Sequence, residues 1–473
     1  MSLSTTITLE RKLFLFSGQG LVTALSIVAL VLLSALAGKA DIARTAAAQS
    51  AFLDERNEAI EEWRGALIAY EEAGEAESPY DARPMNLRIP AVLPPAPLAD
   101  FAGGSAELYP TTAVLTGWAN PADLFTKYEF DNPVPLSIGR LDPTFLVVVL
   151  LPLIMIAASF DILASDREGG RAKLVAVQAG QLHRSVWERL WLRNASIWAT
   201  FSVAAVMMAL LPASGADMGM RLLHFAAWLA IAWVYGAFWF GLIALASIVI
   251  KKGETVASAL FAAWAMFVFA VPAVGGALAE GLYPPPSRLA FLSEMRKGEV
   301  AAIRQTAALT AGILADHPEM TVSDEAVPAF FNRAYVANRE AGKRTTPVLI
   351  AFEESRNQRL SLVSYVQYAS PSLIADRALT AVAGGDIERA MAYQRQAREA
   401  LAELFDLIGP AVAAKQRISL AQFEAIPAFQ YKERSLGDIL ASSAVPLAYL
   451  VLLGFGLVAL ARRRLAAPLE QIL

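Results

Sequence analysis

Six long apolar stretches constrain this chain more than any other feature of its sequence. Each can form a helix that crosses a hydrocarbon layer of about 30 Å, which takes roughly 20 residues at about 1.5 Å per residue. The stretches are residues 13–36, 143–163, 195–213, 222–250, 255–278 and 439–461. Hydrophobic residues make up 56% of the chain and charged residues 18%, a balance typical of membrane proteins. The sequence therefore predicts an all-α membrane protein with six transmembrane helices.

Basic residues at the ends of these stretches predict one orientation by the positive-inside rule. The loop 164–194 carries six Lys/Arg against three Asp/Glu, Lys251 and Lys252 close the fourth stretch, and Arg462–Arg464 follow the sixth. Six crossings place all these sites and both termini on the same side of the membrane. We expect this side to be the cytoplasm, with residues 462–473 as a cytoplasmic tail.

The two long segments between the stretches, residues 37–142 and 281–437, then face away from the cytoplasm as two mainly helical domains. Residues 39–77 have helical apolar spacing and predict an amphipathic continuation of the first span, whereas the proline-dense residues 79–97 predict a linker or an extended arm. In the second segment, helix breaks are expected near His317-Pro318, Ser370-Pro371, Gly384-Gly385 and Gly409-Pro410, and Thr321 with Asp324 fits a capping box.

The loop after the second stretch carries the most informative charge pattern. A glycine pair ends the helix, mixed charges precede and follow it, and apolar residues come next. The residues concerned are Asp166, Arg167, Glu168, Gly170, Arg171, Lys173 and Leu174. Two interpretations stay open: a short amphipathic element that docks a cytoplasmic partner, or a solvated loop whose charges only fix the topology.

The run Asp166-Arg-Glu-x-Gly170, just after a span and before a basic run, resembles the loop of ABC-2-type transporter permeases. Residues 132–133, 139–143, 370–372 and 383–386 resemble the bacterial branch of that family with a large extracytoplasmic domain of unknown function. The sequence departs from the family in having Asp166 where glutamate is frequent and Gly170-Arg171 where Gly-Thr is usual.

The resemblance implies that the loop is a coupling helix that contacts a separate ABC ATPase subunit, with residues 1–12 as an interfacial elbow helix. It also implies a second permease copy or a sister permease, a bacterial inner-membrane location, and room for a periplasmic partner. The chain contains no G-x-x-x-x-G-K-[ST] phosphate loop, so ATP and Mg²⁺ belong to the partner and no cofactor is expected in this chain.

No catalytic, cofactor-binding or metal site is expected. The chain has no cysteine and three dispersed histidines, and adjacent glutamates on a helix point in different directions. Arg221 and His224, at the start of the fourth stretch, fit snorkelling to the membrane interface. A net charge of −4 gives no reason to expect nucleic-acid binding. A membrane-tethered enzyme therefore lacks a catalytic constellation.

The fourth stretch is rich in aromatic residues. Trp233, Tyr235 and Trp239 predict either helix packing or the apolar lining of a substrate path. Gly236 and Gly241 allow helices to approach closely. Pro152 and Pro272 are expected to kink the second and fifth spans.

Two functions follow from these observations. The first is the permease subunit of an ABC transporter that exports or extracts a substrate of unknown identity. The alternative is an ATP-driven mechanical transmitter that acts on a periplasmic or envelope partner without translocating a substrate.

Overall fold

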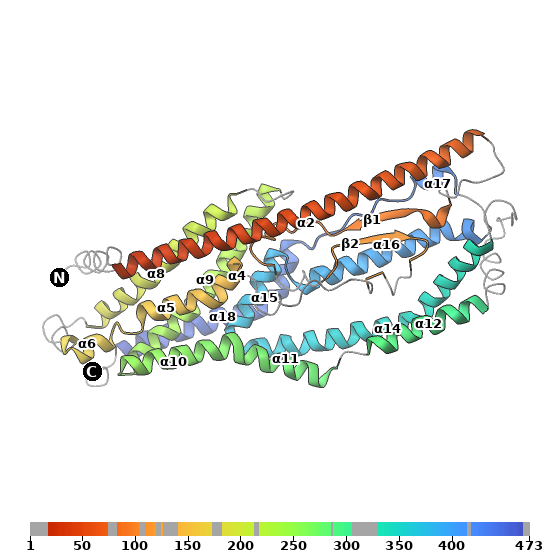
Figure 1. Ribbon diagram of the computed structural model, residues 1–473. Coiled ribbons are helices and arrows are strands. Elements are labelled where there is room, and N and C mark those ends of the chain that lie inside the picture. Colours follow the sequence, from red (N-terminus) through yellow and green to blue (C-terminus); the bar gives the residue numbers. More distant parts are fainter. Residues whose placement is uncertain are drawn as a thin grey trace.

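The computed structural model describes residues 18–73, 83–103, 109–119, 124–125, 141–172, 182–211, 217–284, 287–304, 329–413 and 418–466. These residues are mostly helical and form one elongated body (Figure 1). The helix α2 (Gly18–Ala73) is 56 residues long and runs along nearly the whole body. Its second half confirms the prediction that an amphipathic helix continues the first span.

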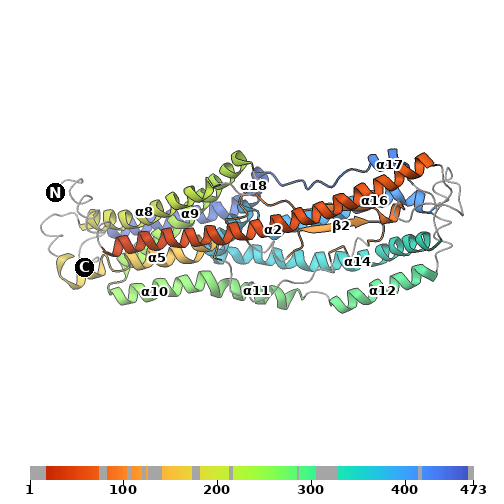
Figure 2. The same cartoon turned by 45° about the horizontal axis from the view of Figure 1, so that its top comes forward.

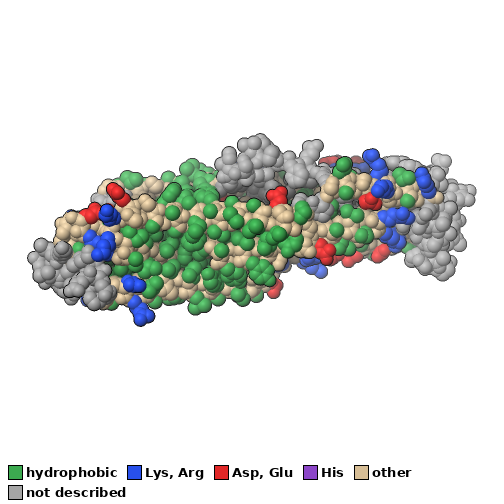
Figure 3. Space-filling model, turned by 90° about the horizontal axis from the view of Figure 1, so that it is seen from below, with side chains coloured by type: hydrophobic (Ala, Val, Ile, Leu, Met, Phe, Trp, Pro, Cys, Tyr) green, Lys and Arg blue, Asp and Glu red, His purple; other side chains and the backbone are tan. Residues whose placement is uncertain are grey.

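Five helices of the described chain are long and apolar enough to cross a membrane. They are α2, the broken helix Pro143–Glu168, α9 (Met218–Val249), the broken helix Gly253–Leu282, and α18 (Leu436–Leu465). On the face seen in Figure 3, hydrophobic side chains gather over one half of the molecule, and Lys and Arg gather at the end of that half. The chain is therefore a membrane-embedded helical protein.

Residues 195–209 of the predicted third span, residues 195–213, lie within α8 (Leu182–Ala209), and residues 212–213 lie outside the described residues. This helix begins 13 residues earlier than predicted and includes Arg184, Arg189 and Arg193, so α8 is not among the five apolar helices. It packs along the first half of α2. A sixth crossing by its apolar half stays a prediction.

Both predicted proline kinks coincide with π-helical turns. The second span consists of α4 (Pro143–Phe145), η4 (Leu146–Leu150) and α5 (Leu151–Ser159), and Pro152 follows the π turn η4. The fifth consists of α10 (Gly253–Ala265), η5 (Met266–Ala270) and α11 (Val271–Leu282), and Pro272 follows η5. Proline lacks an N–H and its ring clashes with the carbonyl four residues earlier, and a π turn relieves that clash.

The glycines of α9 allow the close contacts expected of them. A Cβ added at Gly236 would lie 2.3 Å from the Trp198 ring of α8. One added at Gly241 would lie 2.8 Å from Leu457 of α18. Because neither glycine has a side chain, α9 packs tightly against both neighbours.

Beyond the membrane helices lies a second compact part, here called the distal body. It contains η2 (Pro84–Asn86), β1 (Arg88–Val92), β2 (Thr112–Thr116), α12 (Arg288–Arg304), α14 (Ala329–Val366), α16 (Ile387–Ala413) and α17 (Leu420–Glu424), with the second half of α2. The helix η6 (Gln367–Ala369) and the helix α15 (Pro371–Ala383) connect it to the membrane helices, because α15 packs on α9 and α18. β1 and β2 are antiparallel, with Ile89 opposite Leu115. In Figures 1 and 2 the strands lie between α2 and α16, and α12 lies beside α14.

The distal body joins both segments that the sequence divided into two domains. Trp63 and Leu67 of α2, Leu115 of β2, and Leu401 and Ile408 of α16 belong to one buried cluster. The division into two domains is therefore replaced by one shared core. The strand β1 lies inside the proline-dense stretch, where only a linker or an extended arm was expected.

The predicted helix breaks have mixed outcomes. Ser370 caps α15, and Gly384 ends α15 with a φ of 83°, so these two breaks are confirmed. The break at Gly409-Pro410 is wrong, because α16 continues to Ala413. Pro410 lies in the last turn of α16, where few residues follow the lost hydrogen bond. His317-Pro318 and the Thr321–Asp324 box lie outside the described residues.

Candidate functional site

The loop element at the end of the second span is tied to three neighbouring helix ends. We call Ser165–Arg171, together with these helix ends, the junction. Asp166 of α6 (Ala164–Glu168) accepts hydrogen bonds from Arg171 Nε at 3.0 Å and from Arg189 of α8 at 2.5 Å. Its side chain is 14% exposed, whereas that of Arg171 is 63% exposed. Asp166 therefore holds α6 against α8 and fixes Arg171 at the surface.

The Arg167 side chain caps the C-terminal end of α9. Its guanidinium donates to the carbonyls of Ser247, Ile248 and Ile250 at 3.2, 2.8 and 2.9 Å. The last carbonyls of a helix have no hydrogen-bond donor within the helix and carry a partial negative charge. A guanidinium there donates hydrogen bonds to these carbonyls and offsets their charge.

Glu168 and the glycine pair complete the element. The carboxylate of Glu168 accepts a 3.4 Å hydrogen bond from the N–H of Gly253, the first residue of α10. Gly169 follows α6, and Gly170 has a φ of 70°, a conformation that other residues adopt only at a cost.

An apolar cluster supports these polar contacts from beneath. Leu163 and Leu190 are buried in it, together with Ile248 of α9 and Leu465 of α18. Arg462 of α18 lies over the Trp187 ring at 4.7 Å. The sequence did not predict the contacts of Arg189 and Arg462. Both were counted only as basic residues that indicate the orientation in the membrane.

The junction thus connects the second span to α8, α9 and α10, and α18 packs beneath it. Glu168, Gly169, Gly170 and Arg171 form its exposed face. The described part is therefore tied to neighbouring helices on its inner side and exposed on its outer side, and docking of a partner there stays a prediction. Lys173 and Leu174 lie outside the described residues.

The three aromatic residues proposed for a substrate path differ in exposure. Tyr235 and Trp239 are fully buried in the helix core, and Trp233 is 44% exposed. The Tyr235 hydroxyl contacts the Val148 carbonyl at 2.9 Å and Ser372 Oγ at 2.8 Å. Of the three, only Trp233 faces outward in a single chain, and a shared path stays a prediction.

Arg221 and His224 are buried rather than exposed, so the expected snorkelling of their side chains is wrong. Arg221 is fully buried and donates to both carboxylate oxygens of Asp100, at 2.8 and 2.6 Å, and to the carbonyls of Pro97 and Ala209. We call Asp100 and Arg221 the joint, because they fasten the distal body to the start of α9 and the end of α8. His224 is also buried, with its Nδ1 2.8 Å from the Val382 carbonyl.

Ion pairs in the distal body hold the extended segment that leads to α18. Glu433 pairs with Arg389 at 2.7 Å, and Arg434 pairs with Asp386 at 2.5 Å. Burial raises the pKa of Asp386, although the charge of Arg434 opposes that shift. These pairs fix the path by which the distal body continues into the last membrane helix.

Two of the cavities among the described residues lie away from the junction. One is an apolar groove of about 690 Å³ between α2 and α8, lined by residues that include Val31, Ala35 and Met208. The other, of about 300 Å³, lies in the distal body between α2, the strands and Arg389. Among the residues that the structure describes, no group of three or more His, Asp or Glu side chains is arranged to hold a metal ion.

Comparison with known proteins gives one match. A family described as a domain of unknown function (DUF3526) matches residues 288–432, less than a third of the chain. The match begins at α12, includes α14, α15, α16 and α17, and ends just before α18. No curated protein and no solved structure matches the chain.

Proposed function

We propose that this protein is the permease subunit of an ABC transporter in the bacterial inner membrane and that a separate ATPase subunit binds the junction. The observation that carries this proposal is the contact of Asp166, Arg167 and Glu168 with α8, α9 and α10. A small element attached to several membrane helices transmits a push to all of them. A solvated loop transmits none.

In this proposal the junction lies in the cytoplasm with both termini, and the distal body lies in the periplasm. Export or extraction of a substrate is the expected activity, and a second permease copy or a sister permease completes the membrane part. ATP and Mg²⁺ bind only to the ATPase subunits.

The mechanical-transmitter alternative has its own support. The helix α2 continues from the membrane part into the distal body without a break, and Tyr235 and Trp239 are packed in the core. A continuous helix carries displacement over its length, about 84 Å at 1.5 Å per residue. In this alternative the same ATPase moves the distal body and nothing crosses the membrane.

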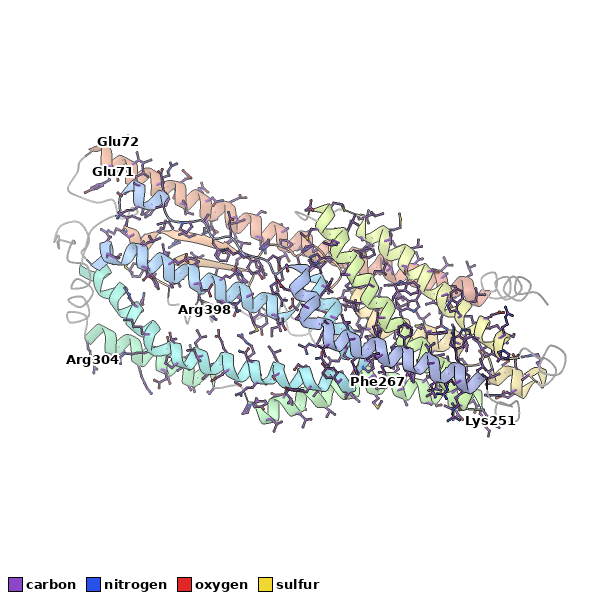
Figure 4. The ribbon with its side chains drawn as sticks, turned by 180° about the vertical axis from the view of Figure 1, so that it is seen from behind. Glu71, Glu72, Lys251, Phe267, Arg304 and Arg398 are labelled. Carbon is purple, nitrogen blue, oxygen red and sulfur yellow. The ribbon has the colours of Figure 1, made fainter. Side chains whose placement is uncertain are left out.

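Crosslinking from single cysteines tests the shared part of both proposals, because the natural chain has none. We expect Arg171→Cys, in native membranes, to crosslink to a polypeptide that contains a G-x-x-x-x-G-K-[ST] loop. The matched control is Glu72→Cys, at the far end of α2, which should give no such product (Figure 4). Recovery of the ATPase from Glu72→Cys, or its absence from Arg171→Cys, contradicts the proposal.

Transport assays then separate the two functions. The purified complex is reconstituted into vesicles and supplied with a cell extract and ATP, and the vesicle contents are analysed by mass spectrometry. ATP-dependent enrichment of a compound supports the permease. ATP hydrolysis without any enrichment supports the transmitter.

A further inference from the structure

An elbow at the end of α14 reaches between the membrane helices. The helix α14 ends at Val366, η6 turns the chain, and α15 starts after Ser370. Val366 packs on Gly275 of α11, where an added Cβ would lie 2.7 Å from its side chain. The Tyr368 ring lies 5.4 Å from that of Tyr449 of α18. We call Gln367–Ser372 the elbow; it is a different segment from the elbow helix expected at residues 1–12.

The elbow lies well inside the apolar half of the protein. It contacts Phe267 in the fifth span and Tyr235 in α9. Each contact is about 20 Å from the junction end of its helix at 1.5 Å per residue, and a hydrocarbon layer is about 30 Å thick. Figure 4 shows Phe267 between Lys251, near the junction, and Arg398 in the distal body. Polar groups at such depth are costly unless they are paired.

Ser370 replaces a hydrogen bond that Pro272 cannot make. In η5 the N–H of Val271 bonds the Met266 carbonyl, five residues earlier. The next donor in that register is residue 272, a proline without an N–H, so the Phe267 carbonyl lacks a backbone donor. Ser370 Oγ donates to that carbonyl at 2.5 Å.

Side chains also contact the π turn of the second span, although Pro152 in the same register faces the Val147 carbonyl and the side-chain donors reach the next two carbonyls. The Val148 carbonyl lies four residues before Pro152 and accepts from the Tyr235 hydroxyl at 2.9 Å. The next carbonyl, Val149, accepts from Trp264 Nε1 at 2.9 Å. Ser372 Oγ lies 2.8 Å from the same Tyr235 hydroxyl. The elbow therefore contacts the π turn of one span directly and that of the other through Tyr235.

We propose that the elbow is a strap that holds the proline-associated bends of the second and fifth spans and links them to the position of the distal body. Without the Ser370 hydroxyl, the Phe267 carbonyl has no donor and the bend at η5 relaxes. Movement of α14 changes the same bond, since α14 leads directly into the elbow. The proposal does not depend on which partner binds the junction.

Distances between spin labels test the strap in the full-length protein in lipid nanodiscs. The labels are placed at Leu282→Cys, at the end of α11, and Val445→Cys in α18, which are 62% and 70% exposed. A change of about 20° at η5 moves the end of α11 by about 5 Å, given its length beyond Pro272. We expect Ser370→Ala to shift or broaden the distance distribution by this amount.

The matched control is Ser442→Ala, which removes a hydroxyl that bonds the Ile439 carbonyl within its own helix. It should leave the distribution unchanged. A second variant, Pro272→Ala, restores the missing N–H and should itself alter the distribution, while Ser370→Ala added to it changes nothing more. The strap is overturned if neither Ser370→Ala nor Pro272→Ala changes the distance distribution. It is also overturned if the shift in the double variant equals the sum of the shifts in the two single variants.

The link to the distal body has its own measurement. Glu353 of α14 pairs with Arg398 of α16 at 2.6 Å, so Glu353→Gln loosens α14 without touching the membrane helices. We expect this variant to broaden the Leu282–Val445 distribution when Ser370 is present and to have no effect in Ser370→Ala. An equal response in both backgrounds overturns the link. No ATPase takes part in these measurements, so their failure leaves the proposed function intact.

Discussion

The junction and the joint both place an arginine at the end of a helix, where it donates to three carbonyls in the junction and to the Ala209 carbonyl in the joint, yet they differ in their access to water. Arg221 and Asp100 of the joint have side chains that are 1% and 0% exposed. In the junction, Arg167 is partly buried and the adjacent Arg171 is 63% exposed. The joint is therefore closed to water in this structure. The junction combines a fixed inner side with an outer face that a partner can reach.

Breaking the joint should have the largest effect on stability. Asp100→Asn leaves a buried guanidinium without its counter-charge, which costs about 3–5 kcal/mol. The effect is measured as the free energy of unfolding of the purified protein in detergent micelles. The control is Glu424→Gln, which removes an exposed partner of Arg64 and should cost less than about 1 kcal/mol. Equal losses of stability in the two variants would show that the buried pair of the joint contributes no more than an exposed ion pair.

Removing the helix-capping arginine of the junction should cost less. Arg167→Ala deprives three carbonyls of α9 of a charged donor, for which we expect about 3 kcal/mol in the same assay. Arg167→Lys keeps the charge but has no planar fork, so it should recover only part of the loss. Full recovery of stability by lysine would mean that a positive charge alone is enough to stabilise the end of α9.

Packing between the junction and the joint gives a third, smaller expectation. Gly236→Ala places a Cβ against the Trp198 ring and should cost about 1–3 kcal/mol by overpacking. Gly276→Ala is the matched control, because no heavy atom lies within 4 Å of its added Cβ. It should be neutral or slightly stabilising, since alanine favours a helix more than glycine does. A harmless Gly236→Ala would indicate that α8 moves freely against α9.

The sequence predicts most of what apolar length and local chemistry determine. The boundaries of α9, α18 and the fifth helix agree with the apolar stretches, and the breaks at Ser370 and Gly384 follow from residues that cap or end helices. Likewise, Gly236 indicates a close approach, though the sequence does not reveal that Trp198 is the neighbour.

Long-range pairing could not be predicted in this way. Arg221 and Asp100 are 121 residues apart, and a lone arginine at the start of an apolar stretch indicates an interface residue equally well. The same holds for the strand β1, which lies among prolines and pairs only because β2 lies beside it. At the junction, the sequence identifies the charged residues, but the partners of Arg167 are main-chain carbonyls that no side-chain pattern reveals.

The smallest effect on stability, and the sharpest test of the comparison, concerns Arg171. It is exposed and pairs with Asp166, so Arg171→Ala should cost less than about 1 kcal/mol. If the exposed face binds the ATPase, the same variant should weaken the stimulation of ATP hydrolysis in the reconstituted complex by about tenfold, equivalent to about 1.4 kcal/mol of binding. Arg64→Ala, an exposed arginine of the distal body, is the control and should leave the stimulation unchanged. Normal stimulation in Arg171→Ala, with stability also unchanged, would mean that Arg171 makes no contact with the partner.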